Sequence, residues 1–154
     1  MLYRLRQRLN DEGGFTLIEL LVVILIIGIL AAIAIPAFLS QTSKASDSAA
    51  KTQVGTLQTT MESFATENNG SYLGAEIEKL RVIEPTLKDE SQTIPKVESA
   101  TATGFKVESE VKGTKNKYYL ENNGGTITRT CEVASESVPG GCKLTGGKGV
   151  TGTW

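Results

Sequence analysis

Histidine is absent from this chain of 154 residues, which removes the commonest general base and the commonest metal ligand of proteins. The sequence also contains no CxxC, GxSxG, P-loop or dinucleotide-binding motif. Its acidic residues are scattered and form no Asp/Asn-rich loop of the calcium-binding type. We therefore expect a protein that is not an enzyme and that holds no cofactor and no metal ion.

Neither sign of charge is in excess, since 16 Lys and Arg residues face 17 Asp and Glu residues. Bulk electrostatics therefore favours neither nucleic acid nor an acidic substrate as a partner. Lys143 and Lys148, near Trp154, could contact a phosphate backbone. Two lysines and one aromatic side chain are a weak basis for nucleic-acid binding, and a solvated tail is the ordinary interpretation.

No charged residue occurs between Glu19 and Lys44. Within this interval, residues 20–38 are apolar except for one glycine and one proline, and at 1.5 Å per residue they span roughly 28 Å as a helix, close to the hydrocarbon thickness of a bilayer. The preceding segment is basic, with Arg4, Arg6 and Arg8. This arrangement predicts a cytoplasmic N-terminus and an exported C-terminal domain.

Three interpretations of the N-terminal segment are open. It can be a simple single-span anchor of a surface domain, or a secretory signal peptide cut among the small residues 31–37. It can also be cut between Gly14 and Phe15, which leaves the apolar helix on the mature protein. Only the third interpretation accounts for the glycine pair, the aromatic residue, Thr16 and the carboxylate of Glu19 together, because a lone charge in a membrane segment usually has a function or a partner.

The sequence Gly13-Gly14-Phe15-Thr16-Leu17-Ile18-Glu19, followed by apolar residues, resembles the processing site of type IV prepilins. The resemblance implies that residues 1–14 are a leader and that Gly14 is the glycine required by the prepilin peptidase. Phe15 would then become the N-methylated first residue of the mature chain.

The same resemblance implies that Phe15, Thr16 and Glu19 act in assembly, with Glu19 meeting the N-terminal amine of a neighbouring subunit. Opposite charges interact strongly at low dielectric, whereas a lone buried charge is heavily penalised. The carboxylate can therefore set the axial register of subunits, since only one offset brings the amine to it.

Gly28 and Pro36 interrupt the apolar helix. A proline inside a helix removes one backbone hydrogen bond and kinks or breaks the helix, although transmembrane helices tolerate this. The resemblance implies that the stretch from Gly28 to Pro36 loses helical structure when the subunit enters a filament.

Residues 40–69 are predicted to continue as an amphipathic helix. One face is apolar at steps of four and three, with Ala50, Val54, Leu57, Met61 and Phe64. Asn68-Asn69-Gly70 is a helix stop and turn signal. Asn69 also begins an Asn-x-Ser sequon with Glu67 two residues before it, a possible glycosylation site.

Residues 70–154 are predicted to form a globular head with a small antiparallel sheet. A short helix is expected at 75–80, in a region that Pro85 and Pro95 break up. Alternating patterns predict strands around 105–111, 118–120 and 126–131, with a hairpin turn at 122–125. The fold class is therefore α+β, a long N-terminal helix on about three strands, similar to the pilin fold.

Cys131 and Cys142 lie near the C-terminus. In a chain with a membrane-inserted N-terminus, such a pair indicates a disulfide formed outside the cytoplasm, with two free thiols as the alternative. The glycine-rich tail cannot build a core of its own. A disulfide would hold it in place and would stabilise the fold by about 2–3 kcal/mol. The resemblance implies the same bridge, because type IV pilins commonly close their C-terminal loop in this way.

The resemblance implies a major pilin of a type IV pilus, with residues 15–39 as the transmembrane and filament-core helix. The alternative within the family is a pseudopilin of a type II secretion system. The implied partners are further copies of the chain, minor pilins, the prepilin peptidase and methyltransferase, the inner-membrane assembly platform with its ATPases, and membrane lipid before assembly. The implied location is the inner membrane for the precursor and the cell surface for the filament, with roles in adhesion, twitching motility or DNA uptake.

Overall fold

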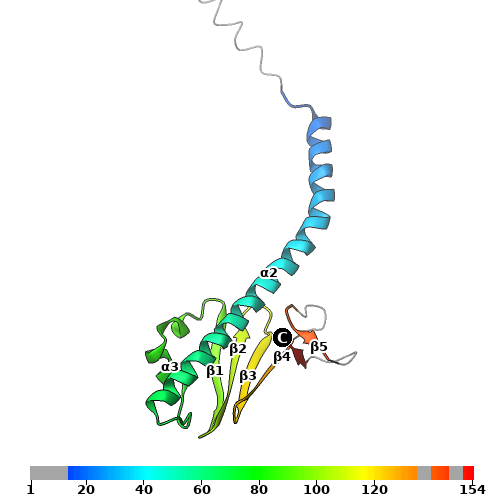
Figure 1. Cartoon of the computed structure of the whole chain (residues 1–154). Helices are drawn as coiled ribbons and strands as arrows, with labels where there is room; N and C mark the ends of the chain where they lie inside the picture. Colours follow the sequence, from blue (N-terminus) through cyan, green and yellow to red (C-terminus); the bar gives the residue numbers. More distant parts are fainter. Residues whose placement is uncertain (1–13, 135–139, 146–150) are drawn as a thin grey trace, which may run out of the picture. The chain divides into compact units, whose positions relative to one another are not determined.

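Figure 1 shows a computed structural model of the chain, which describes residues 14–134, 140–145 and 151–154. The chain divides into two compact units between Phe38 and Leu39, and each unit is treated separately below. The predicted leader, residues 1–14, lies outside the described residues except for Gly14.

Helix α2 extends from Leu17 to Glu67, and its first part is the helix described in the first unit. From Leu17 to Phe38 its large apolar side chains are all exposed, and the helix continues through Pro36. Among the described residues, α2 is the one helix that is long and apolar enough to cross a membrane. An apolar surface that runs all round a helix is typical of a membrane span or of the core of an assembly.

In the second unit, α2 is amphipathic as predicted. All five residues of the expected apolar face are buried, from Ala50 to Phe64. The helix ends where expected, because Asn69 and Gly70 adopt positive φ angles of 55° and 81° and the Gly70 N–H returns to the Ala65 carbonyl oxygen at 2.7 Å. The Asn68 side chain helps to close this end by donating to the Phe64 carbonyl at 2.8 Å.

A connecting segment follows, with helix α3 (Ile77–Ile83) and the 3₁₀ turn η1 (Pro85–Lys88). The short helix predicted at 75–80 therefore exists but begins and ends later. Pro85 begins η1, a position that suits proline because its fixed φ angle matches the first turn of a helix.

Within the described residues, six strands form one antiparallel sheet in the order β1-β2-β3-β4-β6-β5, of which Figure 1 labels β1 to β5. They are β1 (Thr93–Ala100), β2 (Gly104–Val111), β3 (Lys117–Asn123), β4 (Thr126–Glu132), β5 (Lys143–Leu144) and β6 (Thr151–Thr153). The prediction of about three strands found β2, β3 and β4 but missed β1. Pro95 lies inside β1 instead of breaking up the region, and the sheet accepts it because β1 is an edge strand.

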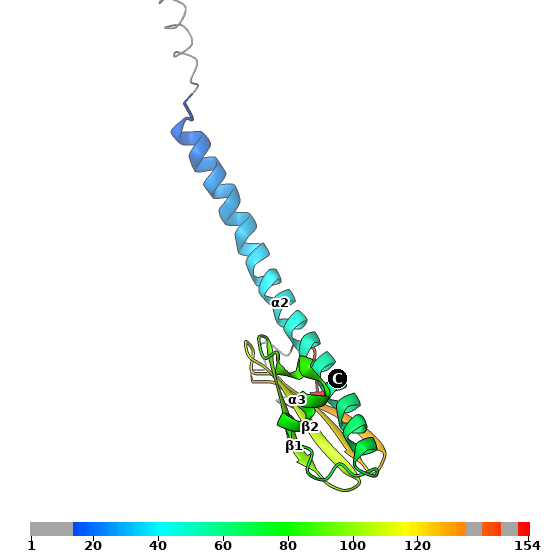
Figure 2. The same ribbon diagram turned by 90° about the vertical axis from the view of Figure 1, so that its left-hand side faces the viewer.

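The core of the head lies between α2 and one face of the sheet (Figure 2). In β2 the four residues expected on the core face, Phe105, Val107, Ser109 and Val111, are buried, but Glu108, expected on the opposite face, is buried as well. In β4 the predicted alternation is wrong for two of its three residues, because Ile127 and Arg129 are exposed and only Cys131 is buried. The sheet thus extends beyond the helix on the β4 side, where β6 and β5 continue it.

Candidate assembly site and disulfide loop

The start of α2 brings Thr16 and Glu19 into contact. The backbone N–H and the hydroxyl of Thr16 both donate to Glu19 Oε2, at 2.9 and 2.8 Å, and the Glu19 N–H donates to Thr16 Oγ1 at 3.3 Å. This reciprocal pattern is a capping box, in which the side chain three residues into the helix satisfies a backbone donor at the N-cap. Thr16 and Glu19 therefore serve the helix of the single chain before any partner is present.

Both hydrogen bonds to the Glu19 carboxylate reach Oε2. No group of the described residues donates a hydrogen bond to Glu19 Oε1. This oxygen can therefore accept from a donor on another molecule. Phe15, 90 % exposed, directly precedes the N-cap. A charge at this helix end is also in its favourable place, since the N-terminus of a helix attracts negative charge.

The other residues predicted for processing, helix melting or glycosylation take no part in the Thr16–Glu19 hydrogen bonds. Gly14 is exposed, and Gly28 and Pro36 lie within α2 in the first unit. Asn69 is exposed in the turn after α2, in the second unit.

Cys131 and Cys142 form the predicted disulfide, with their Cα atoms 5.8 Å apart. Cys131 belongs to β4 and Cys142 directly precedes β5, and both are buried. The bridge closes a loop of which residues 135–139 lie outside the described part of the chain. The glycine-rich tail predicted at 146–149 and Lys148 also lie outside it.

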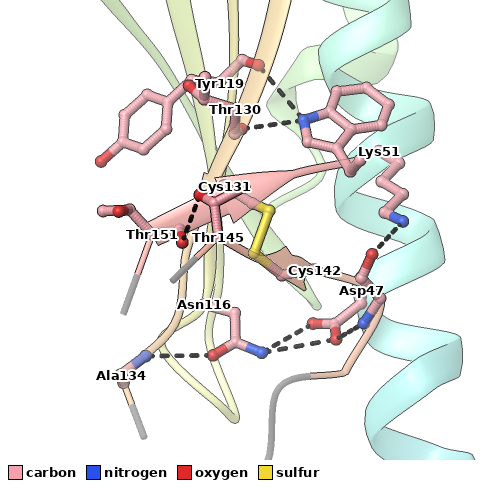
Figure 3. The surroundings of a disulfide bond; sticks show 12 residues. Asp47, Lys51, Asn116, Tyr119, Thr130, Cys131, Ala134, Cys142, Thr145 and Thr151 are labelled. Atoms are coloured by element: carbon pink, nitrogen blue, oxygen red, sulfur yellow. Dashed lines mark hydrogen bonds between the residues drawn. A yellow bond between two sulfur atoms is a disulfide. The ribbon is translucent and has the colours of Figure 1, made fainter. Parts of the chain in front are cut away.

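A polar cluster beside the disulfide was not predicted (Figure 3). Its centre is Asp47 of α2, which is fully buried and accepts from the Gly141 N–H at 2.9 Å. One helical turn later, Lys51 donates to the Gly141 carbonyl oxygen at 2.7 Å. Gly141 is thus held at both of its backbone polar groups by one face of α2.

The surroundings of this cluster shift the pKa values of two side chains, Lys51 and Tyr118. Burial lowers the pKa of Lys51, an effect that Asp47 opposes and Lys143 reinforces. The pKa of Tyr118 is raised, first by burial and then by the negative charge of Asp47. Lys51 also lies over the ring of Tyr118, with 5.4 Å between Nζ and the ring centroid.

Two glycines pack closely against α2 where the loop meets the helix, and glycine is required at the first of them. A Cβ atom on Gly140, whose φ is +55°, would collide with the Asp47 carboxylate. A Cβ atom on Gly141 would lie 2.7 Å from Lys51 Nζ. In the sequence, the pair Gly140-Gly141 beside Cys142 and the i, i+4 pair Asp47 and Lys51 are each visible as local patterns, but nothing in the sequence connects one with the other.

Trp154 is used inside the head. Its indole N–H lies near the carbonyl oxygens of Thr130 and Tyr119, at 2.9 and 3.3 Å, and Lys51 and Arg129 lie over its ring. These contacts occupy both the indole N–H and the ring of Trp154, the aromatic side chain named above as a candidate for nucleic-acid contact. Among the described residues, no three His, Cys, Asp or Glu side chains gather into a possible metal site.

Comparison with known proteins identifies the family. Residues 9–35 match the prokaryotic N-terminal methylation motif. The type IV major pilin protein PilA of Myxococcus xanthus (strain DK1622) is 52 % identical over 63 residues, which are 40 % of this chain and 29 % of that protein. A fimbrial protein of Pseudomonas aeruginosa is 36 % identical over 148 residues, 95 % of this chain and 85 % of that protein. The chain belongs to the type IV pilins.

A third relative, the type IV major alpha-pilin of Moraxella bovis, is 31 % identical over 125 residues, 79 % of this chain and 70 % of that protein. No solved structure matches the chain. As a type IV pilin of the major, fimbrial kind, the chain is a structural subunit and not an enzyme. Membership implies processing by a prepilin peptidase and polymerisation, and the apolar N-terminal helix is consistent with a membrane precursor and a surface pilus.

Proposed function

We propose that this type IV pilin is cut between Gly14 and Phe15, that the new amine on Phe15 is N-methylated, and that this amine pairs with Glu19 of a neighbouring subunit in the filament. The single observation that carries the proposal is the capping box of Thr16 and Glu19. The capping box gives the Glu19 carboxylate a hydrogen-bonding partner while the subunit waits in the membrane before assembly. Both of its bonds to the carboxylate reach Oε2. An incoming amine can then bind Oε1 without unfolding the start of the helix.

The physical reason for cleavage follows from the charges. Before the cut, the nitrogen of Phe15 is a neutral amide and offers Glu19 of another subunit no charge. After the cut it is an amine with a positive charge at neutral pH. Burial of the carboxylate against other subunits is then compensated, whereas an unpaired buried charge is strongly destabilising.

Before assembly, we expect lipid to cover the exposed apolar side chains of residues 17–38, with residues 15–39 acting as the transmembrane segment. The assembly platform and its ATPases would extract the subunit, and the same side chains would then bury one another and those of minor pilins in the filament. Melting of the stretch from Gly28 to Pro36 on extraction and glycosylation of Asn69 stay predictions.

The head also presents a surface suited to a neighbouring copy, which we name the hydroxyl face of α2. It consists of Thr52, Thr56, Thr59, Ser63 and Thr66, spaced four or three residues apart. This spacing places the set about half a helical turn from the buried apolar face, and four of the five residues are exposed, with Thr56 half-buried. The set contains no charged residue.

Each hydroxyl of this face is already satisfied by the helix itself. Every one of the five donates to the carbonyl oxygen four residues earlier, at 2.9–3.2 Å. A polar group that is hydrogen-bonded costs much less to remove from water than one that is not. The hydroxyl face can therefore be covered by an apolar helix of another subunit without leaving hydroxyl donors unpaired.

Replacement of Glu19 by alanine tests the proposal. We expect membrane levels of the subunit to be unchanged and sheared surface filaments to fall by about tenfold or more, because the neighbour's amine is left unpaired. Glu67→Ala, which removes an exposed carboxylate at the other end of α2, is the control and should assemble normally. Wild-type filament levels from the Glu19→Ala strain would refute the pairing, and N-terminal sequencing that does not begin at Phe15 would refute the cut.

A further inference from the structure

Asp47 is a carboxylate with no exposed surface, and the proposed assembly function does not use it. A buried carboxylate is retained in a fold only when other groups satisfy its charge and its hydrogen-bonding capacity. Its partners come from two places that are distant in the sequence, and both are tied to the disulfide loop.

On one arm of that loop, Asp47 Oδ2 accepts from the N–H of Gly141, one residue before Cys142. On the other arm, the N–H of Ala134, three residues after Cys131, donates to Asn116 Oδ1 at 3.2 Å. Asn116 is itself buried.

The two arms are connected through the side chains. Asn116 Nδ2 donates to Asp47 at 3.3 Å to Oδ1 and 3.4 Å to Oδ2. Figure 3 shows the contacts from Ala134 through Asn116 to Asp47, and the bond from the Gly141 N–H to Asp47 completes the chain. We call this chain of contacts the Asp47 clasp. It joins the same two arms as the disulfide, at Ala134, three residues after Cys131, and at Gly141, one residue before Cys142.

The clasp attaches the loop to α2, which the disulfide does not do. The disulfide connects β4 to the residue before β5 and so acts within the C-terminal part of the head. Asp47 belongs to α2 and Asn116 directly precedes β3, so the clasp fixes the loop to the helix and to the sheet. Lys51 strengthens the attachment to α2 through the Gly141 carbonyl.

We propose that Asp47 and Asn116 are positioning residues for the disulfide: by closing the loop a second time without a covalent bond, they bring Cys131 and Cys142 together and set how readily the bridge forms and is reduced. Thermodynamic linkage makes the effect reciprocal, because whatever stabilises the closed loop stabilises the bridge by the same factor. The clasp also holds the loop on α2 after the bridge is reduced.

The reaction to be measured is exchange with the glutathione couple. A thiolate of one cysteine attacks glutathione disulfide, forms a mixed disulfide and releases one glutathione. The thiolate of the second cysteine then attacks the mixed disulfide, forms the Cys131–Cys142 bond and releases the second glutathione. Two protein thiols are oxidised and one glutathione disulfide is reduced to two glutathione molecules.

The first experiment measures this equilibrium in the full mature chain in detergent, over a series of glutathione ratios, with Asp47→Ala and Asn116→Ala as variants. We expect the equilibrium constant for bridge formation to fall about five- to tenfold in each. Asp47→Asn, which keeps an acceptor for the Gly141 N–H, should recover part of the loss. This variant and Asn116→Ala also carry the test if Asp47→Ala does not fold.

Two controls separate positioning from a general loss of stability. Val107→Ala removes buried apolar volume from β2, away from the loop, and should lower the thermal midpoint without changing the bridge equilibrium. Asp89→Ala removes an exposed carboxylate that accepts from the Ser91 N–H and should change neither. Equal bridge equilibria in the wild type, Asp47→Ala and Asn116→Ala would overturn the proposal.

The second experiment is hydrogen exchange of the Ala134 and Gly141 amides in the reduced protein. If the clasp holds the loop by itself, both amides should stay protected in the reduced wild type and should exchange about tenfold faster in reduced Asp47→Ala. Equally fast exchange in the two reduced proteins would show that the disulfide alone closes the loop, which contradicts the proposal.

Discussion

The two halves of α2 differ in what covers them. From residue 17 to 38 the helix is almost entirely apolar and almost entirely exposed, whereas from residue 43 to 65 it is mostly polar and buries nine side chains. The more apolar half is thus the less buried one, as expected if its partners, as proposed above, are lipid and other subunits and not its own chain. Apolar composition indicates that a surface must be covered, and only periodicity indicates that the same chain covers it.

The difference predicts that the same truncation of a leucine will destabilise the head in one half of α2 and have no effect on it in the other. Leu57→Ala, in the core of the head, should destabilise the mature protein by about 2–5 kcal/mol, the usual loss for a buried leucine. Leu25→Ala, the same change on the exposed apolar half, should leave the head unchanged. Thermal unfolding in detergent, followed by Trp154 fluorescence, measures both. A similar loss from the two variants would mean that the halves share one core.

A smaller effect is expected where the head buries backbone against α2. Gly140→Ala places a methyl group against the buried Asp47 carboxylate at a positive φ angle and should cost about 1–3 kcal/mol, as overpacking does. Gly113→Ala is the matched control, because a Cβ atom there meets nothing within 4 Å. Equal thermal midpoints for the two variants would contradict the close contact of the loop with α2.

Alkaline pH should affect the stability of the head through its tyrosines and lysines, side chains that residues 14–38 do not contain. The pKa of Tyr118 is raised in the folded protein, so above about pH 10 the unfolded state loses a proton that the folded state keeps. Stability should therefore fall with rising pH, by about 1 kcal/mol at pH 11 from this residue. The lowered pKa of Lys51 acts in the opposite direction.

Thermal midpoints of the wild type and of Tyr118→Phe between pH 8 and pH 11 measure this contribution. The variant should lose less stability over the interval than the wild type does. Parallel curves would show that the Tyr118 hydroxyl titrates normally in the fold.

The smallest effect on head stability is expected at the hydroxyl face. Thr59→Lys should change the free energy of unfolding by less than about 0.5 kcal/mol, as exposed substitutions usually do. It should nevertheless reduce filament yield, because a charge would be trapped against an apolar helix. Thr59→Val should assemble normally, and Glu67→Lys controls for added charge at the end of α2. Normal filaments from Thr59→Lys would show that this face is not covered in the pilus.

Prediction from the sequence succeeded where a pattern is local. The apolar face of α2, the end of the helix at Asn69 and Gly70, and strands β2 to β4 each follow from periodicity or turn chemistry within a few residues. Strand β1 was missed because Pro95 suggested a break, and only its place at the edge of the sheet makes that proline acceptable.

The candidate sites show the same limit. The segment from Gly14 to Glu19 could be singled out because a carboxylate heads an apolar run. The contacts of Asp47 could not, since its partners lie 69 and 94 residues further along the chain. Strands β5 and β6 were also missed, because they have only two and three residues, too few for an alternating pattern, and are defined by their pairing with each other and of β6 with β4.

The most direct test of the account is the distance between the Phe15 nitrogen and the Glu19 carboxyl carbon of different subunits in the filament. Filaments assembled from a mixture of ¹⁵N-phenylalanine and ¹³C-glutamate subunits allow dipolar coupling to be measured by solid-state NMR only between neighbours. The account predicts a coupling that corresponds to about 4 Å, the range of a close ion pair. Intact filaments that show no intermolecular coupling between these two atoms would contradict it.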